Sequence, residues 1–188
     1  MGREDWMALV AEALRDPRRN ARRILDWPLP ERALGLAVLL VSVVAVLGLY
    51  GTLVLGGAGL GGPFPPPLAM VALQVVAMAL MAALMAGVGR LFGGKGGFAG
   101  ALRLMVWLQA LMILMQVVQL VALLILPPLA GLVSLATLAA VGWVASGFVA
   151  GLHGFKSQGM TFLGILGSFL ALGFVLSIVL LPFVSVPQ

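Results

Sequence analysis

The most constraining feature of this sequence is the point at which its acidic residues stop. All six Asp and Glu side chains lie at or before Glu31, and the 157 residues that follow contain none. Only 9% of the chain is charged and 62% is apolar, whereas a soluble domain has about 25% charged residues. The body of the chain cannot form a water-exposed surface. The composition therefore predicts an integral membrane protein, not a soluble or disordered one.

The charge and the reactive residues exclude further classes. The net charge is only +5 and no dense basic stripe accompanies the aromatic residues, so we expect no nucleic-acid partner. The absence of cysteine excludes disulfides and thiolate metal sites. His153 is the only histidine, and it lies about 10 Å along one predicted helix from Ser146, too far for a catalytic pair. We expect no enzyme activity, no metal and no cofactor.

Five apolar stretches are each long enough to cross a bilayer, whose ~30 Å core takes about 20 helical residues. None alternates with a period of two, as a membrane strand would, so each is predicted to be a helix. The predicted spans are residues 33–55, 68–91, 101–126, 129–152 and 160–181. Gly and Pro separate them, most clearly in residues 56–67 and at Pro127-Pro128. The predicted fold class is an all-α, polytopic bundle of five transmembrane helices within residues 33–188.

Segments that carry Lys or Arg alternate along the chain with segments that carry neither, and this alternation indicates the orientation. The first 32 residues hold seven, residues 56–67 none, the connection around Lys95 three, the Pro127-Pro128 turn none and the last loop one. Because positive loops stay in the cytoplasm, we expect a cytoplasmic N-terminus and a periplasmic C-terminus. Nine Arg against two Lys, with many Ala, Leu, Gly and Val, are typical of a GC-rich bacterial genome. The expected location is a bacterial inner membrane.

Residues 1–32 form a polar cytoplasmic head with a short amphipathic helical segment. Asp16 is the predicted N-cap of a helix that has Pro17 at its first position. The polar side of this helix carries Arg18, Arg19, Arg22 and Arg23. A basic amphipathic segment before a span can contact anionic lipid headgroups, at roughly 1 kcal/mol per basic residue. The alternative is that these arginines only set the topology.

The connection between the second and third spans is rich in glycine and carries Arg90, Lys95 and Arg103. It has neither a G-x-x-x-x-G-K-[ST] motif nor a preceding strand, so a nucleotide site is not expected. Its three cations either hold a lipid phosphate at the cytoplasmic face or only set the topology.

Polar side chains inside the spans are mostly amides, namely Gln74, Gln109, Gln116 and Gln119. They either hydrogen-bond between helices or line a path for a polar solute. Small residues recur at four-residue spacing, as in the pairs Gly147 and Gly151, and Gly164 and Ser168. Such pairs allow close helix packing, either within the chain or between copies in a homo-oligomer.

Two short motifs make the chain similar to a known family. They are Leu91-Phe92-Gly93-Gly94-Lys95-Gly96-Gly97-Phe98, running into Ala101-Leu102-Arg103, and Gly151-Leu152-His153-Gly154-Phe155. With the five spans they resemble the bacterial branch of the Yip1 domain family over roughly residues 33–181. Gly97 replaces a common Ser, the third span lacks a Pro, and the Asp-Leu-Tyr-Gly-Pro motif of eukaryotic members is absent, so their GTPase binding and vesicle trafficking are not carried over. The resemblance implies a five-helix membrane protein whose bacterial relatives have no settled activity.

The leading functional hypothesis is a non-enzymatic membrane scaffold or adaptor, because the body is rich in packing motifs and poor in reactive groups. Its expected partners are anionic lipid headgroups at the cytoplasmic face and either another membrane protein or a second copy. A small-solute permease or channel, and a lipid-handling protein, are the alternatives.

Overall fold

Every secondary-structure element in the computed structural model, which describes residues 3–57 and 65–180, is an α-helix. The helices of these residues are α1 (Arg3–Arg15), α2 (Pro17–Leu25), α3 (Glu31–Leu55), α4 (Pro67–Leu91), α5 (Phe98–Ile125), α6 (Pro127–His153) and α7 (Gln158–Leu180). The predicted all-α fold class is confirmed.

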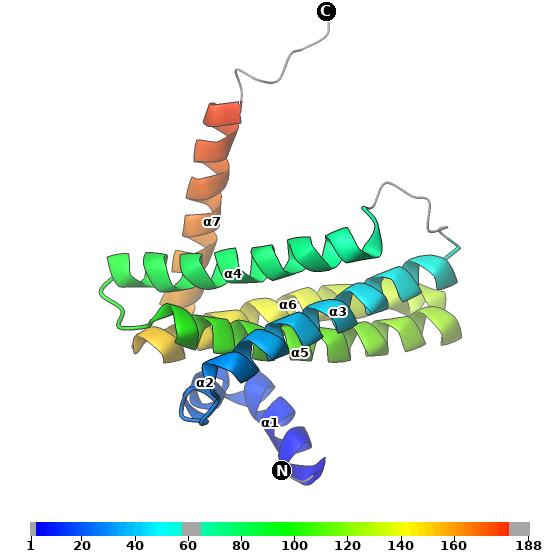
Figure 1. Cartoon of the computed structure of the whole chain (residues 1–188), viewed down its shortest axis with the longest axis horizontal. Helices are drawn as coiled ribbons and strands as arrows, with labels where there is room; N and C mark the ends of the chain where they lie inside the picture. Colours follow the sequence, from blue (N-terminus) through cyan, green and yellow to red (C-terminus); the bar gives the residue numbers. More distant parts are fainter. Residues whose placement is uncertain (1–2, 58–64, 181–188) are drawn as a thin grey trace, which may run out of the picture.

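Helices α3 to α6 lie side by side along the long axis of the molecule and form an up-and-down bundle (Figure 1). Each is long and apolar enough to cross a membrane. Their ends lie within three residues of the first four predicted spans. Large apolar side chains such as Leu36, Leu40 and Leu47 face outward, as expected where lipid tails cover the protein.

The fifth predicted span, residues 160–181, is present as α7, but α7 does not run alongside the other four helices. It leaves the end of α6 at a steep angle (Figure 1). The turn occurs at Gly154, which ends α6 in the left-handed conformation with a φ of 74°. All five predicted spans are therefore helices; four of them lie side by side, and α7 packs against α6 at one end. Residue 181 and Pro182, the predicted end of this span, lie outside the described residues.

The ends of the helices follow the predicted start and stop signals. The Asp16 side chain accepts a hydrogen bond from the Arg19 backbone N–H at 3.0 Å, with Pro17 at the first helical position, so the predicted cap is confirmed. Proline also begins α4 and α6. Of the predicted loop at 56–67, residues 58–64 lie outside the described residues.

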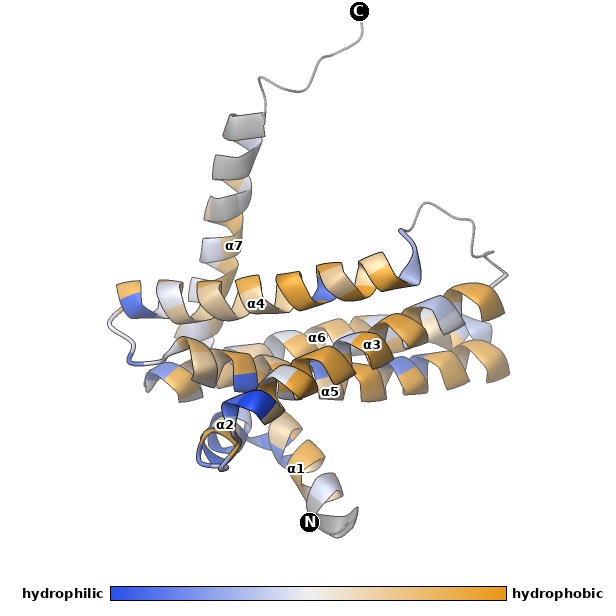
Figure 2. Cartoon of the chain, viewed as in Figure 1, coloured by the Kyte–Doolittle hydropathy of each residue, from blue (hydrophilic) through white to orange (hydrophobic). Residues whose placement is uncertain are grey.

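The two ends of the bundle differ in polarity (Figure 2). At the basic end lie α1, α2 and the connections 92–97 and 154–157. At the neutral end lie the last residues of α3, the first residues of α4 and the turn between α5 and α6. The head helices α1 and α2 pack against α5 and α6. The main buried cluster is at the basic end and includes Leu9, Ala13, Ala21, Leu104, Trp107, Val144 and Phe148. The head therefore contributes to the core instead of hanging free of it.

Candidate functional site

The two glycine-containing motifs meet in space around His153. Gly89, Gly94 and Gly96 surround its imidazole so closely that a Cβ on Gly89 or Gly94 would overlap ring atoms. A Cβ on Gly96 would lie 2.7 Å from the ring Cε1. The His153 side chain is only 4% exposed. We name these four residues the His153 cradle, and glycine is required there because any side chain would occupy the space of the ring.

Both ring nitrogens of His153 have backbone partners. The N–H of Gly96 donates to Nδ1 at 3.1 Å, so Nδ1 is the unprotonated nitrogen. The other nitrogen, Nε2, lies 3.0 Å from the carbonyl of Met85 and donates its proton to it. The ring also stacks on Phe155, with centroids 5.4 Å apart. His153 therefore joins α6, α4 and the α4–α5 connection as a neutral bridge.

Three of the predicted cationic contacts donate hydrogen bonds to backbone carbonyls at the basic end. Arg103 donates to the carbonyl of Leu25 at the end of α2 and to two carbonyls between α2 and α3, at 2.9 to 3.4 Å. Arg18 donates to two carbonyls of the α6–α7 connection, at 2.8 and 2.5 Å. Arg90 donates to the carbonyl of Gly96 at 3.0 Å. These arginines fix the connecting segments to the helices, since hydrogen bonds from charged donors are the stronger ones.

The other predicted cations point outward. Arg19 and Arg23 of α2 each lie 3.3 Å from a carboxylate oxygen of Glu12 in α1. Arg22 and Lys95 are exposed. Among the side chains that the structure describes, which begin at Trp6, no carboxylate oxygen lies within 4.0 Å of Arg22 or Lys95. Arg22 and Lys95 are thus the predicted cations best placed to meet an external anion.

The head is seated on a glycine face of α6. A Cβ on Gly147 would overlap the ring of Pro17, and a Cβ on Gly151 would lie 2.7 Å from Cβ of Ala21. The Trp143 indole donates a hydrogen bond to the carbonyl of Leu14, the next-to-last residue of α1, at 3.0 Å. Gly147 and Gly151 therefore allow α2 of the same chain to pack closely against α6, because small residues permit a close approach of the two backbones.

The four glutamines lie between helices. Gln74 of α4 donates to Gln109 of α5 at 3.1 Å, and Gln119 of α5 donates to Ser134 of α6. Gln116 faces Gly48 of α3, whose added Cβ would lie 3.0 Å from its amide oxygen. The side chains join different helix pairs, so they do not form one continuous chain of hydrogen bonds.

Sequence reasoning singled out both motifs but did not place them together. It considered His153 as a catalytic residue and the glycines as a phosphate-binding loop, and it rejected both interpretations. The available signal was the position of His153. It lies next to one glycine-containing connection, and the second glycine-rich connection is predicted on the same side of the membrane. Among the described residues, no three His, Asp or Glu side chains gather as a metal site requires.

Comparison with known proteins identifies a family. The family model described as the Yip1 domain matches residues 11–180, from within α1 to the end of α7. The match includes α2 and both motifs that form the His153 cradle. It is a match to the family as a whole, so the bacterial branch stays a prediction. No curated protein and no solved structure matches the chain.

Proposed function

This chain belongs to the Yip1 domain family, and on that premise we propose that it is a non-enzymatic membrane scaffold. Its working surface would be a rigid, positively charged platform at the basic end, made of α1, α2 and the connections 92–97 and 154–157. The scaffold would be embedded through its apolar helices, four of which are long enough to cross the membrane.

One observation carries the proposal: hydrogen bonds hold the helices and connections of the basic end to one another. Arg18, Arg90 and Arg103 use their donors on backbone carbonyls of the surrounding connections. His153 fixes α4 to the α4–α5 connection from the end of α6. A surface held in this way keeps one shape, which lowers the ordering cost of binding a partner. Arg22 and Lys95 remain outward as contacts.

The charges support an orientation with the platform in the cytoplasm of a bacterial cell. Basic residues gather at one end of the bundle, and positive loops stay on the cytoplasmic side. There the outward cations would meet anionic lipid headgroups, at roughly 1 kcal/mol each. The partner held beside them would be another membrane protein or a second copy of the chain.

The permease alternative receives less support. A polar path needs side chains with free donors and acceptors along one line. Gln74 and Gln109 instead bond to each other, and Gln119 bonds to Ser134. Interhelical pairs of this kind hold helices together, so the glutamines favour a packed body.

The test is purification of the tagged, full-length protein from its host in mild detergent, followed by mass spectrometry of what accompanies it. We expect a stoichiometric partner with the natural sequence and its loss when Arg22→Ser and Lys95→Ser are combined. Arg23→Ser is the matched control, because Glu12 already neutralises Arg23. A partner that stays with the double variant, or its absence from the natural protein, would overturn the proposal. Solute flux in proteoliposomes that Gln109→Leu abolishes would move the function to a permease.

A further inference from the structure

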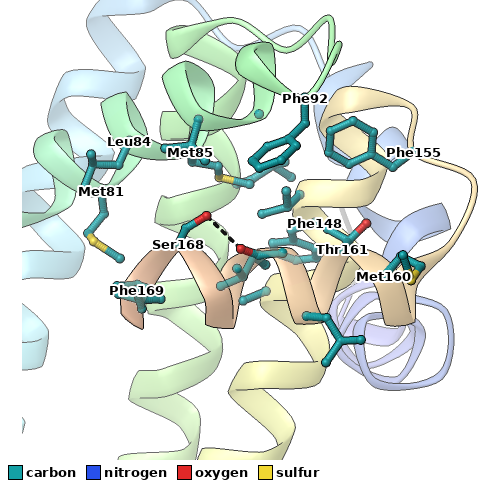
Figure 3. A pocket seen from close by; sticks show the side chains of 18 of the residues that line it. Met81, Leu84, Met85, Phe92, Phe148, Phe155, Met160, Thr161, Ser168 and Phe169 are labelled. Carbon is teal, nitrogen blue, oxygen red and sulfur yellow. Dashed lines mark hydrogen bonds between the residues drawn. The ribbon is translucent and has the colours of Figure 1, made fainter. Parts of the chain in front are cut away.

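A large apolar cavity lies between α4 and α7, over α5 and α6. Its volume is about 740 Å³. Met81, Leu84 and Met85 of α4 face Thr161, Ser168 and Phe169 of α7 across it, and Phe92 and Phe155 lie near one of its ends (Figure 3). Two of the hydroxyls on its wall donate within α7 or to its start, Thr161 to the Ser157 carbonyl and Ser168 to the Gly164 carbonyl, and the Ser157 hydroxyl accepts from the Met160 N–H. The cavity therefore favours an apolar occupant.

The small-residue pair of α7 belongs to this cavity. Gly164 and Ser168 both line it, and a Cβ on Gly164 would meet no atom within 4 Å. By contrast, residues of the head occupy the space in front of Gly147 and Gly151 of α6. The α7 pair is thus a small-residue face with open space in front of it.

The cavity has the depth of one leaflet. On α4 its lining begins at Met81, ten residues before the helix ends at Leu91, which corresponds to about 15 Å of rise. The hydrocarbon core is about 30 Å thick, so the cavity occupies the half nearest the basic end. An occupant would come from the lipid of that leaflet.

The charge at the cavity points to the headgroup. Lys156 is the only charged residue among the described lining residues, and it is exposed on the α6–α7 connection. No acidic residue follows Glu31 in the sequence, and the ion pairs of the described residues involve Glu12 alone. A phosphate at the membrane surface would supply the missing counter-charge.

The volume argues against a helix as the occupant. A helix with its side chains is about 10 Å across, so 740 Å³ would hold fewer than about two turns. A second copy of the chain could not place a whole span there. An acyl chain is narrow and ends within one leaflet, and it fits both the volume and the depth.

We propose that this cavity binds one acyl chain of an anionic phospholipid from the leaflet at the basic end, with Lys156 against its phosphate. The site extends the lipid contact of the proposed function. Its test leaves Arg22 and Lys95 unchanged, so that either proposal can fail alone.

The experiment is native mass spectrometry of the full-length protein in detergent, with palmitoyl-oleoyl phosphatidylglycerol or the phosphatidylcholine of the same chains. We expect one phosphatidylglycerol per chain, retained in preference to phosphatidylcholine. Gly164→Phe places a ring in the cavity and should lower retention of both lipids by about tenfold or more. Gly167→Phe is the matched control on the same helix, since Gly167 has open space around it but does not line the cavity.

The headgroup contact has its own variant. Lys156→Gln should weaken phosphatidylglycerol binding by about fivefold and leave phosphatidylcholine binding unchanged. Equal retention of the two lipids by the natural protein would overturn the headgroup assignment. Retention of phosphatidylglycerol by Gly164→Phe, or a lipid-free dimer, would overturn the site. If Gly164→Phe fails to purify as a folded protein, Ser168→Leu fills the same cavity and decides the question by the same readout.

Discussion

The basic and neutral halves of α5 and α6 are built from similar residues but packed differently. The buried residues of α5 all lie between Ala101 and Leu111, and those of α6 all lie between Val144 and His153. In the other halves of these fully described helices, large apolar side chains such as Leu124, Leu132 and Leu138 are more than half exposed. The same two helices are therefore enclosed by other helices at one end, whereas much of their apolar surface is exposed at the other.

The difference shows what organises a membrane protein of this composition. Lipid tails are as apolar as leucine, so apolar character alone does not bring helices together. Close packing at small residues and hydrogen bonds between helices bring them together. At the basic end, glycines allow the head, the α4–α5 connection and His153 to approach closely. At the neutral end, Gly131 of α6 has no atom within 4 Å of an added Cβ. A glycine is informative here only through what lies opposite it.

Of the changes that test this difference between the two ends, one at the His153 cradle should have the largest effect. Gly89→Ala would place a methyl group in the imidazole, and the ring cannot move away without losing its bonds to Gly96 and Met85. Overpacking costs about 1–3 kcal/mol and each lost hydrogen bond about 1 kcal/mol more. We expect a loss of about 3 kcal/mol, measured as a lower midpoint of thermal unfolding in detergent.

The control for this prediction is Gly87→Ala, two residues away on the same helix. An added Cβ at Gly87 meets nothing within 4 Å. Because alanine favours the helix over glycine by up to about 1 kcal/mol, this variant should unfold at the same temperature or higher. Equal midpoints for the two variants would mean that the cradle does not constrain His153.

A smaller effect is expected where the head meets α6. Gly147→Ala would push against Pro17 and loosen α2, whereas Gly131→Ala changes the open end of the same helix. Trypsin cleaves after the arginines of α2 only when the helix opens. A loosening of about 1.4 kcal/mol raises the cleavage rate by about tenfold. We expect that increase for Gly147→Ala and none for Gly131→Ala, by gel or mass analysis of the fragments. Similar rates for both would show that α2 does not depend on its seat.

The sequence predicted the helices well and the contacts poorly, for a physical reason. Span ends depend on local signals, such as Pro67 and Pro127 at helix starts and the long uncharged runs between them. The Asp16 cap is equally local. The steep departure of α7 was missed because Gly154 was interpreted only as part of a polar loop, although a left-handed glycine determines the direction of the chain.

The site residues depended on information that one sequence does not hold. Arg103 lies 74 or more positions from each of its three carbonyl partners, and Arg18 lies 137 or more from its own. Nothing in the local pattern distinguishes these arginines from Arg22, which points outward. The contacts of Arg22 and Lys95 with lipid stay predictions. The glycines around His153 were visible as a pattern, but their partner lies more than 50 positions away.

The smallest effect is expected at the paired glutamines, and it tests whether polar contacts matter equally along the bundle. Gln109→Leu removes the acceptor for Gln74 in α4, and interhelical hydrogen bonds in membranes contribute about 0.6 kcal/mol on average. The double variant with Gln74→Leu should cost no more than either single change, because the two side chains bond to each other. Unfolding in detergent with added denaturing surfactant resolves such a coupling. The matching cycle with Gln119→Leu and Ser134→Ala, nearer the neutral end, should give a similar coupling, since that pair also joins two helices. A coupling found for Gln74 and Gln109 but absent for Gln119 and Ser134 would mean that α5 and α6 separate and rejoin without cost near the α5–α6 turn. In that case the scaffold would be rigid only where its glycines are filled.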